Sequence, residues 1–243
     1  MSRIGEFLHS GGELLHGGPV TMGDLTRVRE TVVFTQPNLK VRLIRFWILL
    51  LLAASIAAAG LLNNSVATVI GAMIVAPLML PIMGLAYGIS IGDGRAILVS
   101  IGVGIGGILT AVGVGWGIAS LMTSASFDPE QVGQIMSRTA PNLIDMFAAL
   151  ATGVAGAFAV GRKDISDTLP GVAIAISLVP PLANAGILFS AGRADLAWGS
   201  ILLFVTNYLA IVLTGAIVLG SWVIRERPWG ADRPTKSASR WPW

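Results

Sequence analysis

Long apolar runs separated by short polar breaks dominate the pattern of this chain. Six of them approach or exceed the length that crosses a bilayer, about 20 residues. They are Phe46–Leu62, Ser65–Ile91, Ala96–Met122, Leu143–Val160, Leu169–Ser190 and Leu196–Ile224. None alternates apolar and polar positions as the strands of a membrane barrel do. The pattern therefore predicts an all-α fold, a polytopic transmembrane helical bundle of six spans.

Prolines interrupt two of these runs at corresponding places. The second run carries Pro77 and Pro81, and the fifth carries Pro180 and Pro181. Proline removes a backbone donor and crowds the carbonyl four residues earlier, so spans two and five are expected to be broken. A carbonyl without a partner costs several kcal/mol in hydrocarbon, and a bound ion or solute is one way to satisfy it.

The chain divides after the third run into two halves of similar layout, residues 46–122 and 143–224. Each half has a first span, a proline-broken second span, a turn with one Asp and one Arg, and a long third span. The acid of each turn, Asp93 or Asp195, is expected to cap the next helix. Three spans per half give a 3+3 inverted repeat, a layout common in transporters. The alternative is that any six-span chain divides into two threes.

Composition and charge agree with a membrane protein and orient it. Only 12% of the 243 residues are charged, against about 25% in soluble proteins. With the N-terminus in the cytoplasm, all Lys and Arg except Arg138 and Arg193 fall on that side, which the positive-inside rule favours. Residues 1–45 are interpreted as a cytoplasmic N-terminal segment, 46–224 as the six-span domain, and 225–243 as a disordered basic tail. Both termini are then cytoplasmic.

Little in the sequence suits an enzyme, a cofactor or a metal. The chain has no cysteine, and its two histidines, His9 and His16, precede the first run. It has no HExxH or GxSxG motif, and the GxGxxG at residues 102–107 does not follow a strand. No catalytic residue, metal or cofactor is therefore expected. The basic residues lie beside apolar runs, so the lipid bilayer, and not nucleic acid, is the expected partner.

Asp145 is the one acid that falls inside an apolar run, and Asn142 precedes it by three residues on the same helical face. Because ionisable groups in membranes are costly and mark functional sites, both are candidate ligands for a substrate or ion. Carbonyls freed near Pro180 would complete that site. The alternative is an acid at the interface that caps a helix or pairs with Arg138.

Two further amides lie within apolar runs. Asn184 follows the proline pair and joins Pro77, Pro81, Pro180 and Pro181 in the candidate substrate or ion site, whereas Asn207 lies well inside the last run. Amides buried in membranes usually bond to a neighbouring helix, which stabilises the fold by about 0.6 kcal/mol. That structural role is the expected one for Asn207 and the alternative for Asn184.

Glycines recur every four residues on two of the runs. Gly84, Gly88 and Gly92 lie on one face of the second run, and Gly102/Gly106 and Gly113/Gly117 repeat the spacing on the third. Such faces let helices approach closely, either within one chain or between copies. They favour tight packing and a homodimer or higher homo-oligomer.

Three stretches carry a family resemblance: Ser65–Pro81 (SVATVIGAMIVAPLMLP), Arg138–Ala159 (RTAPNLIDMFAALATGVAGAFA) and Leu169–Gly186 (LPGVAIAISLVPPLANAG). Together they resemble the uncharacterised hydrophobic domain family of prokaryotic membrane proteins, domain of unknown function 389, over roughly Leu39–Trp222. The resemblance implies a multi-pass protein of the inner (plasma) membrane. It brings no substrate, activity or catalytic residue.

These patterns favour a secondary transporter or channel for a small solute or ion, with a midplane site at the broken helices. The competing hypothesis is a non-transporting membrane scaffold or lipid-associated oligomeric module. The glycine faces and the scarcity of buried charge support that second hypothesis.

Overall fold

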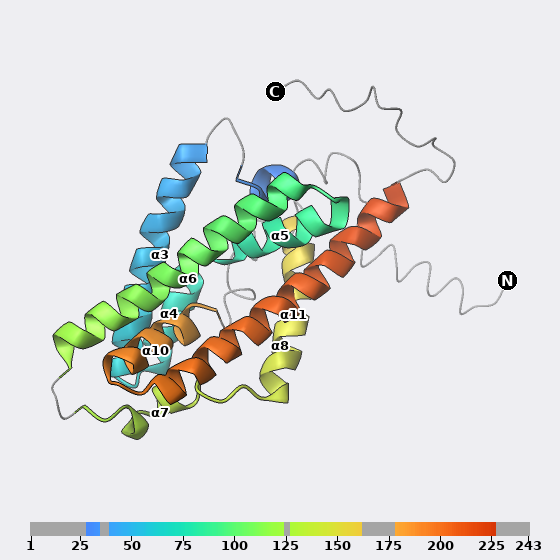
Figure 1. The fold of residues 1–243 in the computed structure, drawn as a ribbon. Coiled ribbons are helices and arrows are strands. Elements are labelled where there is room, and N and C mark those ends of the chain that lie inside the picture. The colour runs from blue at the N-terminus through green and yellow to red at the C-terminus, as the bar shows by residue number, and fades with distance from the viewer. Residues whose placement is uncertain (1–27, 35–38, 124–126, 162–177, 227–243) are drawn as a thin grey trace.

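The computed structural model describes residues 28–34, 39–123, 127–161 and 178–226. Within these ranges the regular structure is helical and contains no strand (Figure 1). Lipid offers no partner to backbone N–H and C=O groups, so a chain this apolar pairs them inside helices. The helices are α3 (Leu39–Leu62), α4 (Val66–Val75), α5 (Met79–Ile91), α6 (Gly94–Met122), η1 (Pro129–Gln131), α7 (Gly133–Met136), α8 (Leu143–Gly161), α10 (Val179–Ser190) and α11 (Ala194–Glu226).

Four helices are long and apolar enough to cross a membrane alone: α3, α6, α8 and α11. The pair α4 and α5 is bent by 50° at the break around Pro77 and counts as a fifth span if the two are taken together. The fifth predicted run contains α10, whose 12 residues are too few to cross alone. Residues 162–177, which hold the start of that run, lie outside the described parts of the chain. Six spans therefore remain a prediction.

Local polar residues set several helix boundaries. Asp93 caps α6, since its carboxylate accepts from the N–H groups of Arg95 at 3.0 Å and Ala96 at 3.1 Å, as predicted. The matching prediction for Asp195 is wrong. Helix α11 begins one residue earlier, at Ala194, which leaves Asp195 inside the first turn with its carboxylate bonded to Arg193.

Part of the predicted N-terminal segment packs onto the helices. Val28, Val32, Val33 and Phe34 are buried, and the Phe34 ring meets the edge of Phe46 at 5.8 Å. The guanidinium of Arg42 on α3 donates to the carbonyls of Glu30, Thr31 and Val33 and holds this segment in place. The interpretations of residues 1–27 and 227–243 fall outside the described residues.

Two long helices frame the centre of the molecule. Helices α6 and α11 run in opposite directions, and α5 and α10 lie near opposite ends of this pair (Figure 1). Each short helix packs against both long ones. Helix α3 packs on α4 and α6, and α8 packs on α11. The two short helices are therefore enclosed by the long ones.

Burial distinguishes the short helices from the long ones. Every residue of α10 from Val179 to Leu188 is buried, and so is every residue of α5 from Pro81 to Gly88. In contrast, α6 and α11 each expose an apolar face, with Leu109 68% and Leu213 57% accessible. Exposed leucines along whole helices are what a lipid environment accommodates.

The backbones of α6 and α10 pack in direct contact at two glycines. A β-carbon on Gly115 would overlap the carbonyl of Ala183, and one on Gly186 would overlap the carbonyl of Val112 and reach the amide nitrogen of Trp116 at 2.6 Å. These two glycines let α10 lie directly on α6. Small residues at such crossings increase dispersion contacts, which drive association where lipid is as apolar as the side chains.

The variant Gly115→Ala is expected to destabilise the protein by about 1–3 kcal/mol, since the added methyl group has no room beside Ala183. The matched control is Gly113→Ala, two residues away, where a β-carbon meets nothing within 4 Å. Thermal unfolding of both variants in detergent measures the difference. Equal melting temperatures for the two would show that α10 does not lie on α6 as described.

Candidate functional site at the helix starts

Helix α10 starts inside the protein without a capping side chain. Its N-cap residue is Leu178, and Pro180 and Pro181 occupy its first turn. The first turn of a helix has N–H groups without an intrahelical partner, and proline has no such group. The two prolines thus halve the number of donors that the buried start must satisfy. The sequence analysis placed this pair mid-span, and the carbonyls it would free belong to Ile176 and Ser177, outside the described residues.

Helix α5 begins in a comparable way. Leu78 is its N-cap, again without a side-chain hydrogen bond, and Pro81 lies in its first turn. The carbonyl of Pro77, four residues before Pro81, accepts from the N–H of Leu80 at 3.1 Å and is satisfied. Pro77 itself has no N–H to offer Met73, so that carbonyl of α4 lacks its ordinary helical donor.

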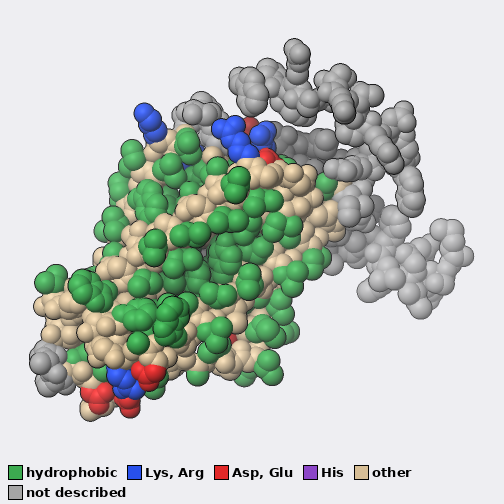
Figure 2. Space-filling model, in the orientation of Figure 1, with side chains coloured by type: hydrophobic (Ala, Val, Ile, Leu, Met, Phe, Trp, Pro, Cys, Tyr) green, Lys and Arg blue, Asp and Glu red, His purple; other side chains and the backbone are tan. Residues whose placement is uncertain are grey.

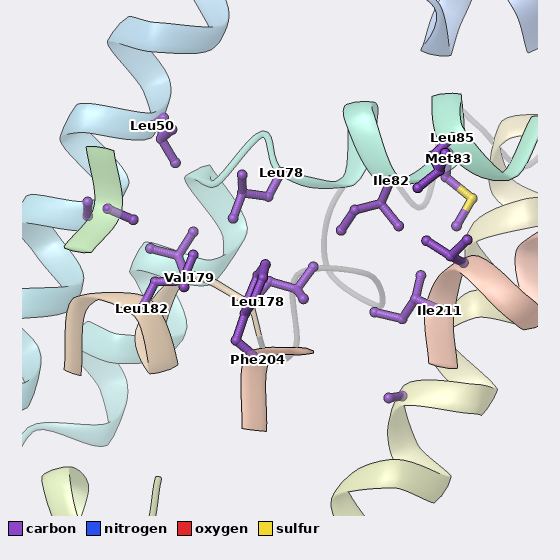
Figure 3. Packing of buried hydrophobic residues seen from close by; sticks show 14 of the residues in the cluster. Leu50, Leu78, Ile82, Met83, Leu85, Leu178, Val179, Leu182, Phe204 and Ile211 are labelled. Carbon is purple, nitrogen blue, oxygen red and sulfur yellow. The ribbon is translucent and has the colours of Figure 1, made fainter. Parts of the chain in front are cut away.

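The two helix starts share one apolar cluster. Figure 3 shows Leu78 before α5 and Leu178 and Val179 at the start of α10 near Phe204 of α11, while Ile211 of α11 lies toward Met83 in the same buried cluster. All five side chains are at most 3% accessible. The described part of the chain therefore brings the starts of two short helices, α5 and α10, to a common apolar cluster.

Asn184 on α10 is a structural link. Its Nδ2 donates to the carbonyl of Ile135 on α7 at 3.0 Å and to Oγ of Ser200 on α11 at 2.9 Å. The side chain is completely buried, and its Oδ1 has no partner. The amide ties α10 to a neighbouring helix, which was the alternative expected from sequence, and leaves one acceptor free.

Asn207 on α11 behaves differently. It is completely buried, and neither Nδ2 nor Oδ1 has a hydrogen-bond partner in the described structure. It lies three residues after Phe204 and four before Ile211, so it shares the helical face that these two present to the core. The prediction that Asn207 bonds to another helix is wrong.

Two further polar groups in the core were missed by the sequence analysis. Ser100 on α6 is completely buried, and its Oγ has no partner in the described residues. The hydroxyl of Tyr208 lies 3.8 Å from where a β-carbon of Gly104 would be, at the approach of α11 to α6. Their polarity within apolar runs was the only available signal, since the sequence does not show which face of each helix is buried.

Asn142 and Asp145 form a capping box at the start of α8. Oδ1 of Asn142 accepts from the N–H groups of Ile144 at 2.8 Å and Asp145 at 3.0 Å. The Asp145 carboxylate accepts from the N–H of Asn142 at 3.2 Å. This reciprocal arrangement satisfies donors at the helix start. No hydrogen bond in the described structure joins either residue to α10.

Arg138 lies close to this cap. Burial lowers the pKa of its guanidinium, and the nearby charge of Asp145 opposes that shift. Its Nη1 donates to Oε1 of Gln134 at 3.1 Å. The predicted ligands therefore separate into two places, with Asn142 and Asp145 at a helix end and the prolines and Asn184 in the core.

Charged side chains gather at two ends of the molecule, with an apolar band between them (Figure 2). At one end Arg193 binds Glu130 of η1 and Asp195 of α11. Hydrogen bonds to Asp195 and then Glu130 raise the pKa of Arg193. At the other end lie Arg42 and Arg95.

The apolar helices and the charge-free band fit a multi-pass membrane protein. The chain matches the family described as "Domain of unknown function (DUF389)" over residues 73–213, more than half of its length, and it belongs to that family. It is 32% identical over 182 residues to an uncharacterized protein of the archaeon Methanocaldococcus jannaschii. The match covers 75% of this chain and 55% of the relative, so the chain spans about half of that protein. No solved structure matches.

The variant Asn142→Ala is expected to lower the free energy of unfolding by about 1 kcal/mol, because α8 loses its N-cap. Asn142→Ser, which retains a capping oxygen, should recover most of that loss. Unfolding in mixed detergent micelles measures both. If the two variants lose the same stability, Asn142 does not act through its capping oxygen.

Proposed function

We propose that this protein is a secondary transporter or channel that moves a small solute or ion across the membrane, and that it is not an enzyme. One observation carries the proposal. Two short helices, α5 and α10, begin at buried residues inside the protein, and both pack against α6 and α11. Non-helical backbone at membrane depth is tolerated where protein covers it or where it lines a path.

The packing partners of the short helices support an inverted repeat. Helix α5 packs on α6 of its own half and α11 of the other, and α10 packs on α11 of its own half and α6 of the other. The outer pairs correspond in the same way, α3 with α6 and α8 with α11. Such a repeat would let one half rock against the other around a central site.

In this proposal the solute passes the starts of α5 and α10. Pro77, Pro81, Pro180 and Pro181 lie at or just before those starts, and the amides of Asn184 and Asn207 hold buried polar atoms without partners. The free energy falls when a solute or water bonds to an unpaired atom, because that buried atom regains a hydrogen bond. Asn142 and Asp145 would contact the solute only where it enters or leaves at the α8 end.

The placement of charge supports an orientation. The start of α3 and the end of α11 lie toward the same end of the molecule (Figure 1). Four basic residues lie near the starts of α3 and α6, toward that same end: Lys40, Arg42, Arg45 and Arg95. By the positive-inside rule this end faces the cytoplasm, with both termini there and the protein in the plasma membrane of a prokaryote.

One observation favours the second candidate, a membrane scaffold or lipid-associated module that works as a homo-oligomer. Gly84 and Gly88 pack within the chain, against Ser100 and Ile97 of α6. Gly102, Gly113 and Gly117 on α6 instead have nothing within 4 Å of their β-carbon positions. Glycines four apart on an open face can receive the same helix of a second copy.

The passage hypothesis predicts that water reaches Asn207. The chain has no cysteine, so Asn207→Cys carries a single thiol. In reconstituted vesicles it should react with a small water-soluble methanethiosulfonate reagent, because only a hydrated thiol ionises and reacts. Leu209→Cys on the exposed face of the same helix, 58% accessible, should stay unreacted in lipid.

A positive control, Gly192→Cys in the exposed turn before α11, confirms that reagent reaches the vesicles. If that thiol reacts and the one at position 207 does not, the centre is dry and passage is excluded.

The oligomer hypothesis predicts that Gly113→Leu lowers the fraction of dimer or higher oligomer, since the side chain would hold the two helices apart. Light scattering coupled to size exclusion in mild detergent measures the mass. Ile101→Leu, on another face of α6, is the control and should leave the mass unchanged. An unaltered oligomer in Gly113→Leu, or a monomeric wild-type protein, would contradict this role for the glycine face.

A further inference from the structure

Building on the proposed passage, we propose that Asn207 is the recognition group of a binding site for a small uncharged solute that both donates and accepts hydrogen bonds. The site lies on the buried face of α11, beside the starts of α5 and α10. The proposal depends on three observations: an amide with no partner, a centre without charge, and close apolar walls.

The first observation is the unpaired amide. Asn207 has 0% accessible surface, and both polar atoms of its side chain lack a partner in the described structure. Asn184, the other buried amide, uses its Nδ2 for two hydrogen bonds within the protein. A buried polar group left unpaired is costly, and a leucine of similar size would avoid that cost. The position of Asn207 is therefore explained by a partner that comes and goes.

The amide also defines the chemistry of that partner. Nδ2 needs an acceptor and Oδ1 needs a donor, so the complementary ligand carries both. A metal cation would coordinate Oδ1, and a ligand with donors alone would bond to the same atom, but both would face the two N–H donors of Nδ2 unfavourably. An anion would bond to Nδ2 and be repelled by Oδ1. Amides, ureas and small alcohols present both kinds of group.

The second observation is the absence of charge around the site. Asp195, the charged residue at the start of α11, precedes Asn207 by twelve positions, about 18 Å along the helix. The described parts of α5 and α10 contain no charged residue, those of α6 have charge only at Arg95, and α8, which packs on α11, has charge only at Asp145 in its first turn. An ion at this depth would lose its hydration without gaining a counter-charge, which strongly disfavours it.

The third observation is the size of the surroundings. Phe204 and Ile211 flank Asn207 along α11 and are at most 3% accessible (Figure 3). The Tyr208 ring lies 5.7 Å from that of Phe204, on the side of α11 that approaches α6. These large side chains form apolar walls around the amide.

Three planar probes of similar size and shape test the charge class: urea is neutral, guanidinium is a cation and nitrate is an anion. Each is presented to vesicles containing the full chain, and stopped-flow light scattering follows swelling. Ionophores for protons and K⁺ dissipate the potential that would oppose the ions. We expect urea to enter at least tenfold faster than in protein-free vesicles, and guanidinium and nitrate to enter at the protein-free rate.

Two variants on α11 test the residue. Asn207→Leu should reduce urea entry at least tenfold while its melting temperature stays equal to or rises above that of the wild type. Thr206→Val is the matched control and should leave urea entry unchanged, since the Thr206 hydroxyl bonds only to carbonyls of its own helix. If Asn207→Leu fails to fold, Asn207→Ser, which removes the amide and adds no bulk, carries the same expectation.

The outcomes separate this inference from the proposed function. Equal entry of guanidinium or nitrate and urea overturns the uncharged class and leaves passage standing. Unchanged urea entry in a folded Asn207→Leu or Asn207→Ser variant overturns the role of Asn207. Failure of urea to enter the wild-type vesicles also overturns the inference. The proposed passage itself falls only if the thiol of Asn207→Cys stays unlabelled as well.

Discussion

The structure depends on one constraint, that backbone polar groups in hydrocarbon must find partners inside the protein. A helix that starts at mid-depth violates this requirement unless other helices cover its first turn. Helices α5 and α10 both start inside the protein, and their residues from Pro81 to Gly88 and from Val179 to Leu188 are all buried. The long helices α6 and α11 meet the constraint by enclosing the two short ones. Pro81, Pro180 and Pro181 lower the number of N–H donors in the first turns that need a partner.

The long helices can pack this closely on their neighbours because glycine lies where the helices cross. Gly115 and Gly186 bring the backbones of α6 and α10 into contact, and Gly153 does the same for α8 against Ile211 of α11. Any larger side chain at these positions would separate the helices and open space around the buried starts. The many glycines thus have two distinct uses, since those at Gly102, Gly113 and Gly117 face open space instead.

Features coded by neighbouring residues could be predicted from the sequence, and features that depend on distant contacts could not. The helical class, the cap at Asp93 and the approximate bounds of α6 and α8 follow from apolar length and local polar residues. The prediction for Asp195 failed because α11 begins at Ala194, two residues before the predicted start at Leu196. Asn184 and Asn207 look equivalent in the sequence. They differ because the first meets the carbonyl of Ile135, 49 residues away, and the second meets no polar atom in the described structure.

The distribution of polar contacts also bears on the proposed rocking of one half against the other. No ion pair crosses the described core, and the amide of Asn184 is the link between α10, α7 and α11. Dispersion contacts between apolar helices change little when the helices shift slightly against each other, whereas a buried ion pair must be broken. The charged tie between η1 and α11, formed by Glu130, Arg193 and Asp195, lies at the exposed end. Water can replace its bonds there, so rearrangement around a neutral core meets a low electrostatic barrier.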